Sequence, residues 1–171
     1  MTTSSLQTHV VLPGTYDPVT LGHVDVVSRA SRLFSCVTVG VAASRSKRGV
    51  GTVFTLEERV QMMIESLEEC GIRGVNVLPF DGLLVDFCRE VGATAVVKGL
   101  RAITDFEYEL QQADLNNHLA PDIESVFVMA TPTYGYLSSS VVRELASLGS
   151  PVDGLVSECV AVRLREHFSA V

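Results

Sequence analysis

The sequence predicts an α/β protein: a single-domain, Rossmann-like, doubly wound sheet of about five parallel strands with helices on both faces. Three observations support this prediction. Short apolar runs rich in β-branched residues alternate with longer segments of helical periodicity, as in successive βαβ units. The length of 171 residues suits one domain. No internal repeat, low-complexity tract or linker divides the chain. We therefore expect a short tail over residues 1–8 and one domain over residues 9–171.

The strands are predicted from apolar runs that are nearly continuous. Strands of a parallel sheet are covered on both faces, so they are apolar along their length instead of alternating with polar residues. The predicted strands are His9–Leu12, Val37–Ala42, Val75–Pro79, Ala95–Lys98 and Ser125–Met129.

The helices are predicted between and after these strands, from periodicity and from capping residues. Two predicted capping boxes begin at Thr55 and Thr104, each with a Glu three residues later. Gly71 and Gly92 stand where helix C-termini are expected. The predicted helices are Thr20–Phe34, Thr55–Cys70, Leu83–Val91 and Asp105–Leu119, one that begins within Ser138–Ser140, and one over Ser157–Phe168.

Charge and composition restrict the class of partner. Thirteen Lys and Arg against twenty Asp and Glu give a net charge of −7. This balance disfavours nucleic-acid binding, which requires many phosphates to be neutralised, but it permits a small anionic ligand held by a few cations. No signal peptide and no apolar run of the ~18 residues that cross a bilayer is seen, so we expect a cytoplasmic protein without a membrane partner. Four widely spaced cysteines form no metal or redox motif and are expected to be small buried residues in a reducing compartment.

The loop after the first strand, from Pro13 to His23, holds residue types suited to phosphate binding. Gly14 permits a sharp turn, and Gly22 lets a ligand approach the backbone closely. Thr20 is predicted as the N-cap of the next helix, which places His23 in the first helical turn. Phosphate is attracted by the free N–H groups and the dipole at that position, and the same field disfavours a charged imidazole. A structural cap is the alternative role for His23; the Thr-x-Gly-His spacing favours function.

Three further loops are candidates, because ligands of such sheets bind at the carboxyl ends of the strands. A basic cluster over Ser44–Arg48 follows the second strand, with a solvated loop as the alternative. Lys98 and Arg101 flank a glycine at the end of the fourth strand, which suits phosphate. The segment Tyr134–Ser140 offers hydroxyls and amides at a helix start, with a simple N-cap as the alternative.

Two levels of resemblance follow from these segments. Thr20–His23 resembles the T/HxGH motif of the nucleotidyltransferase superfamily, which activates nucleotides at the α-phosphate. Together the segments resemble the bacterial phosphopantetheine adenylyltransferases from about His9 to the last helix. The pieces that carry this resemblance are Gly14–Pro18, Ala43–Lys47, Lys98–Arg101, Asp105–Glu109 and Ser138–Ser140.

The resemblance implies transfer of the adenylyl group of ATP to 4′-phosphopantetheine, giving dephospho-coenzyme A and pyrophosphate. It implies Mg²⁺ held mainly by phosphates and water, and a homohexamer. The implied catalytic residues are His23, which stabilises the transition state, and Lys47. ATP contacts are implied for Thr15, Tyr16, His23, Gly99, Leu100, Arg101, Glu109, Tyr134, Gly135, Tyr136, Leu137, Ser138, Ser139 and Ser140. Contacts with 4′-phosphopantetheine are implied for Thr15, Lys47, Leu84 and Lys98.

The chain departs from the family pattern at three places. Tyr16 stands where the family usually has Phe. Lys98 stands where many members have Arg, so the planar guanidinium is replaced by the point charge of an ammonium group. The Arg48–Val53 stretch is longer than usual. Two rival functions stay open: a non-enzymatic nucleotide-binding module, and a nicotinamide mononucleotide adenylyltransferase.

Overall fold

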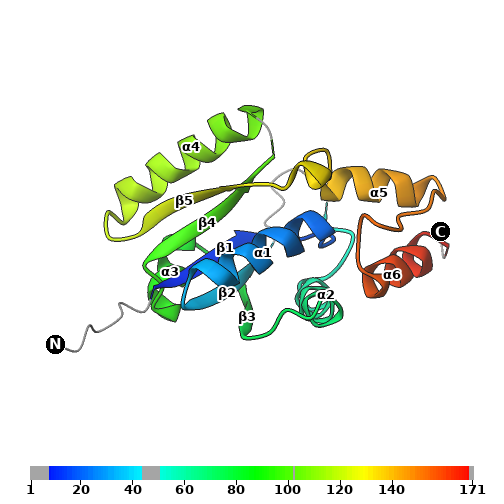
Figure 1. Cartoon of the computed structure of the whole chain (residues 1–171), viewed down its shortest axis with the longest axis horizontal. Helices are drawn as coiled ribbons and strands as arrows, with labels where there is room; N and C mark the ends of the chain where they lie inside the picture. Colours follow the sequence, from blue (N-terminus) through cyan, green and yellow to red (C-terminus); the bar gives the residue numbers. More distant parts are fainter. Residues whose placement is uncertain (1–7, 44–50, 102, 170–171) are drawn as a thin grey trace.

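The centre of the structure is a parallel sheet (Figure 1). The computed structural model describes residues 8–43, 51–101 and 103–169, and in these ranges five strands pair in the order β3-β2-β1-β4-β5. Their bounds are β1 His9–Gly14, β2 Cys36–Ala42, β3 Val75–Phe80, β4 Ala95–Leu100 and β5 Glu124–Met129. All the pairings are parallel. The strand order reverses between β1 and β4, as the doubly wound prediction requires.

Helices cover both faces of this sheet (Figure 1). Helices α1 and α2 pack on one face, and α6 packs against α2 and α5 beyond them; α3 and α4 pack on the opposite face. The bounds are α1 Leu21–Leu33, α2 Leu56–Glu69, α3 Leu84–Val91, α4 Ile103–Leu119, α5 Ser139–Ser147 and α6 Glu158–Ser169. None of the described helices is both long and apolar enough to cross a membrane.

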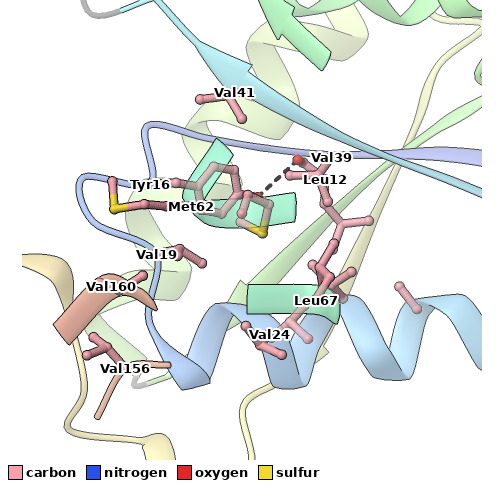
Figure 2. Close-up of a cluster of buried hydrophobic side chains, with 14 of the residues drawn as sticks. Leu12, Tyr16, Val19, Val24, Val39, Val41, Met62, Leu67, Val156 and Val160 are labelled. Atoms are coloured by element: carbon pink, nitrogen blue, oxygen red, sulfur yellow. Dashed lines mark hydrogen bonds between the residues drawn. The ribbon is translucent and has the colours of Figure 1, made fainter. Parts of the chain in front are cut away.

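Successive residues of β1 belong to different hydrophobic clusters. Val10 and Leu12 lie in the larger cluster, with residues of α1, α2 and α6, whereas Val11 lies in the smaller one beside α3. Figure 2 shows part of the larger cluster, to which Leu12, Met62 and Leu67 all belong. Burial on both faces explains why the strand is apolar at each position from Val10 to Leu12.

The predicted helix boundaries are confirmed with one exception. Thr55 and Glu58 form the expected capping box, and Gly92 ends α3 in the left-handed conformation, with φ of 73°. Helix α4 begins at Ile103, so Thr104 lies inside the helix and the predicted cap there is wrong. Asp105 of the first turn instead accepts the backbone N–H of Arg101 at 3.3 Å. A short 3₁₀ helix, η1 (Pro132–Tyr134), was not predicted.

A buried arginine ties together three segments at the carboxyl edge of the sheet. Arg59 of α2 is only 2% exposed. Its Nη1 donates to the carbonyls of Thr15 at 2.6 Å and Ala42 at 2.9 Å, and its Nε to that of Phe54 at 3.2 Å. Burial lowers the pKa of this guanidinium, while the nearby carboxylate of Asp17 opposes that shift. Arg59 therefore joins the ends of β1 and β2 to the start of α2.

Replacing Arg59 by Met is expected to destabilise the fold by about 2–4 kcal/mol, because three carbonyls would lose their donor inside the protein. Urea unfolding, followed by circular dichroism, measures the loss. Arg32→Met is the matched control, since the Arg32 guanidinium makes one exposed hydrogen bond, to the Ser28 carbonyl. The control should change stability by less than about 0.5 kcal/mol. Equal losses in the two variants would contradict the role of Arg59.

Candidate active site

A cavity of about 540 Å³ lies at the carboxyl ends of β1 and β4. This is the point at which the strand order reverses, where ligands of such sheets bind. The cavity brings together residues of three of the four candidate loops, together with Glu109 of α4; the fourth loop, Ser44–Arg48, lies outside the described residues. The predicted residues that line it are Thr15, Tyr16, His23, Lys98, Gly99, Arg101, Glu109, Tyr134, Leu137, Ser138 and Ser139.

Other predicted residues lie elsewhere. Leu100 is buried, and Tyr136 is 67% exposed. Gly135 and Ser140 belong to the segment before and at the start of α5, but they do not line the cavity. Leu84 packs against the smaller hydrophobic cluster. Lys47 lies outside the described residues.

Leu83, not Leu84, lines a neighbouring cavity. This second cavity, of about 350 Å³, lies at the carboxyl ends of β2 and β3, and Ala42 and Phe80 also line it. The difference follows from the helix itself: Leu83 is the N-cap residue of α3, and Leu84 is its first helical residue, packed toward the sheet.

His23 is held at the start of α1 by a reciprocal pair of hydrogen bonds. The N–H of Thr20 donates to His23 Nδ1 at 3.0 Å, and the N–H of His23 donates to Thr20 Oγ1 at 3.4 Å. Thr20 is therefore the N-cap, as predicted. Because Nδ1 accepts a hydrogen bond from a backbone N–H, the neutral imidazole carries its own proton on Nε2 and is a donor there.

The imidazole of His23 is neutral at physiological pH. Burial lowers its pKa to about 4, and the positive charge of Arg101 acts in the same direction. The lowered pKa agrees with the expectation that the field at the start of a helix disfavours a charged imidazole. Its main cause, however, is desolvation. His23 can thus donate a hydrogen bond to an anion without itself carrying a charge.

Arg101 is fixed by a carboxylate that the sequence analysis did not assign to the site. Its Nε and Nη2 donate to the two carboxylate oxygens of Asp105, at 2.9 Å and 3.3 Å. Its Nη1 donates to the carbonyl of Leu137 at 2.9 Å. Arg101 precedes α4 and Asp105 lies in the first turn of that helix, so an acidic residue closely following a cation at the end of a strand was the available signal. Arg101 links the end of β4 to the segment before α5.

Lys98 and Glu109 form an ion pair inside the cavity wall. Lys98 Nζ lies 3.2 Å from Glu109 Oε2, and both side chains are mostly buried. This oxygen accepts no hydrogen bond within the described part of the chain. Two residues implied on different ligands are therefore adjacent in the structure. The arrangement leaves a buried acceptor and an ammonium group at the cavity.

The start of α5 is docked on the loop after β1. Ser139 Oγ donates to the Pro18 carbonyl at 2.7 Å, and Arg143 donates to the Asp17 carbonyl. The Asp17 carboxylate lies 3.8 Å from Arg143 and accepts the N–H groups of Val53 and Phe54. Sequence reasoning missed Asp17 and Arg143 as organising residues, because most of their partners are backbone atoms, which leave no pattern in the sequence.

Comparison with known proteins identifies the family. The cytidylyltransferase-like family matches residues 11–145. A phosphopantetheine adenylyltransferase of Geobacter sulfurreducens is 45% identical over 159 residues, which cover 93% of this chain and 94% of that protein. One of Moorella thermoacetica is 50% identical over 146 residues, covering 85% and 88%. The chain belongs to the phosphopantetheine adenylyltransferase family. The family predicted from the sequence is thus confirmed.

Solved structures with similar folds are more distant from this member of the family. A putative nicotinate-nucleotide adenylyltransferase of Vibrio parahaemolyticus has a TM-score of 0.67 and 14% identity, with 95% of each chain covered. A bifunctional NMN adenylyltransferase/ADP ribose pyrophosphatase of Francisella tularensis has a TM-score of 0.70 and 15% identity, covering 96% of this chain and 50% of that one. At this identity the likeness shows the fold alone, and the predicted Rossmann-like α/β class is confirmed.

The low pKa of His23 predicts a specific loss of stability in acid. The folded pKa is about 4, against the ordinary value of 6.5. Between these values the unfolded chain binds a proton that the folded protein excludes. The stabilising contribution is therefore complete above pH 6.5 and is lost as the pH falls toward 4.

Thermal unfolding between pH 4 and pH 7.5 measures this effect in the wild type and in His23→Gln. The Tm of the wild type should fall more steeply below pH 6.5 than that of His23→Gln, whose side chain does not titrate. His118→Gln, at an exposed position, is the control and should follow the wild type. Parallel curves of Tm against pH for all three proteins would contradict the assignment of the lowered pKa to His23.

Proposed function

We propose that the chain transfers the adenylyl group of ATP to 4′-phosphopantetheine, giving dephospho-coenzyme A and pyrophosphate. The observation that carries this proposal is the 45–50% identity to phosphopantetheine adenylyltransferases over nearly the whole chain. The cavity supports it, because a neutral hydrogen-bond donor and two cations surround a space at the carboxyl edge of the sheet.

The nucleophile is supplied by the substrate. A phosphate oxygen of 4′-phosphopantetheine attacks the α-phosphorus of ATP, a new P–O bond forms, and the bond to the β-phosphate breaks as pyrophosphate leaves. This oxygen is already ionised at neutral pH, so no protein nucleophile or strong base is required. The protein must instead hold two polyanions together in line and stabilise the charge that develops.

The proposed roles rest on the family resemblance and, for the described residues, on the positions of their side chains at the cavity. His23 donates from Nε2 to an oxygen of the α-phosphate, and this bond strengthens as negative charge grows in the transition state. Arg101 offsets phosphate charge on the nucleotide side. Lys98 and Lys47 hold the phosphate of the acceptor, with Lys47 also contributing to catalysis. Thr15, between these groups, positions the attacking phosphate.

The binding residues divide into two sets in this proposal. The first set contacts ATP and the second contacts the acceptor. The ATP set is Thr15, Tyr16, His23, Gly99, Leu100, Arg101, Glu109 and Tyr134–Ser140. The acceptor set is Thr15, Lys47, Leu84 and Lys98.

Mg²⁺ is the proposed cofactor, and the donors present fit an ion held chiefly by the ligand. Among the described residues no cluster of three or more His, Cys, Asp or Glu could hold a metal. The cavity carboxylates are engaged, Asp105 by Arg101 and Glu109 by Lys98. An ion coordinated by phosphate oxygens and water needs no protein cage, and when bound it neutralises phosphate charge.

A homohexamer is part of the same proposal. Several large apolar side chains of α4 and β5 are exposed in the single chain, which supports an interface there. They are Leu110, Leu115, Leu119 and Met129. A cytoplasmic location is also proposed, supported by four cysteines that are all free.

The deciding experiment supplies the purified protein with ATP, Mg²⁺ and 4′-phosphopantetheine and measures pyrophosphate and dephospho-coenzyme A. Both products should appear in equal amounts. A parallel reaction with nicotinamide mononucleotide as the acceptor tests the main enzymatic rival. Binding of ATP without pyrophosphate release would favour a non-enzymatic nucleotide-binding module and would contradict the proposal.

Replacing His23 by Ala is expected to lower turnover by about 10²–10³-fold while ATP binding is retained, because one donor to the transition state is removed. Steady-state kinetics and calorimetric titration with ATP separate the two effects. His118→Gln serves again as the control, and circular dichroism checks that His23→Ala is folded. Turnover near that of the wild type would show that His23 does not act on the transition state.

Lys98→Met and Lys47→Met are expected to weaken 4′-phosphopantetheine binding by about one to two decades, with a much smaller effect on ATP. Arg101→Met should instead weaken ATP binding, with a much smaller effect on 4′-phosphopantetheine. Isothermal titration of each variant with each ligand measures both affinities. Arg165→Met is the control, since Arg165 pairs with Glu158 on the surface of α6. Equal losses for both ligands in all three site variants would indicate a shared electrostatic field instead of two subsites.

A further inference from the structure

Tyr16 has a backbone conformation that is rare for a large side chain. Its φ is 50°, in the left-handed region, and no other described non-glycine residue has a positive φ. Bulky residues avoid this region, and where the conformation occurs the surrounding contacts must hold it in place. The contacts of Tyr16 therefore indicate what the conformation achieves.

The ring of Tyr16 is turned inward and is fixed at two points. Its hydroxyl donates to the carbonyl of Leu12 at 3.0 Å, and the residue is only 7% exposed (Figure 2). The ring lies directly on Gly14, where an added Cβ would stand 2.8 Å from Tyr16 Cζ. The absence of a side chain on Gly14 thus makes room for the ring against the end of β1.

The inward ring contacts His23. The two rings meet edge to face, with centroids 5.0 Å apart and an interplanar angle of 88°. The hydrogen bond from the Thr20 N–H to Nδ1 fixes one atom of the imidazole but still permits the ring to pivot about that bond. The Tyr16 ring occupies the space into which the imidazole would turn.

We propose that Tyr16 is a positioning residue whose aromatic ring holds the imidazole of His23 with Nε2 directed to the phosphates. This inference rests on the proposed function. It concerns the side chain of Tyr16, whereas the implied contact with ATP concerns the backbone. The ring does the positioning, and the hydroxyl only secures the ring. Tyr16→Phe keeps the ring and removes only the hydroxyl, so this variant separates the two contributions.

The first test compares Tyr16→Leu with Tyr16→Phe in the adenylyltransfer assay. Tyr16→Leu should lower kcat by about 10- to 100-fold with little change in the KM for ATP, because the donor is misplaced and not removed. Tyr16→Phe should restore kcat to within about 3-fold of the wild type. Wild-type kcat in a folded Tyr16→Leu variant would overturn the proposal, as would equal damage in the two variants.

Gly14→Ala gives an independent perturbation of the same contact. The φ of Gly14 is not positive, so Ala is compatible with the backbone, but its Cβ would push the Tyr16 ring away from its position. Gly14→Ala alone should lower kcat. In the Tyr16→Leu background, Gly14→Ala should lower kcat by less than about a further 2-fold, because the ring that the new Cβ would displace is absent. Fully additive losses would overturn the proposal.

A spectroscopic readout separates positioning from a general loss of stability. The chemical shifts of the His23 imidazole should show one fixed ring orientation in the wild type and in Tyr16→Phe, and averaging over several orientations in Tyr16→Leu. The proton should stay on Nε2 in all three proteins, because the Thr20 N–H still binds Nδ1. Phe34→Leu, a partly buried aromatic at the far end of α1, should lower the unfolding midpoint without changing kcat or these shifts. An unchanged His23 signature in Tyr16→Leu would overturn the proposal. An inactive wild type would instead reject the proposed function, and the shifts would still test the ring contact.

Discussion

The hydrogen bonds of Arg59 set the geometry at the carboxyl ends of β1 and β2, on which the loop that carries Tyr16 and His23 depends. A buried guanidinium is costly unless its donors are satisfied, so the three carbonyls that it binds are held in one arrangement. One of these carbonyls belongs to Thr15, which immediately precedes Tyr16. The turn that directs Tyr16 toward His23 is therefore anchored from α2, an element that does not line the cavity. The position of Tyr16 is therefore fixed in part by a residue that lies outside the cavity.

Charge pairing explains how a chain with a net charge of −7 can offer a site for polyanions. The cations at the cavity are paired with carboxylates: Arg101 with Asp105, and Lys98 with Glu109. These pairs hold two cations close to each other without strong mutual repulsion. His23 also lines this cavity and remains neutral, chiefly because burial disfavours its charged form, and the charge of Arg101 lowers its pKa further. A ligand with several phosphates can then meet positive groups already in place, and no reorganisation is needed when charge develops.

The elements and most of the cavity could be predicted from the sequence because they depend on local patterns. Apolar runs gave the strands, and the Thr-x-Gly-His spacing placed His23 in the first turn of α1. Arg59 could not be predicted, since an arginine on an amphipathic helix is normally exposed and its acceptors here are backbone atoms far apart in the sequence. Asp17 was missed for the same reason. The cap expected at Thr104 was wrong, because local propensity cannot decide which residue of a hydrophilic stretch begins a helix.

The choice of acceptor cannot be a property of the fold. Proteins named for nicotinate-nucleotide and NMN adenylyltransfer share this architecture at 14–15% identity. In this chain the strand order reverses between β1 and β4, where His23 and Arg101 line the first cavity. The second cavity, with Leu83 and Phe80, lies instead at the ends of β2 and β3. An acceptor that reaches from Lys98 toward this cavity would be selected by the outer strands, while the central strands serve the nucleotide. The two halves are joined at β2, because Arg59 binds the carbonyl of Ala42, which lines the second cavity, as well as that of Thr15, which lines the first.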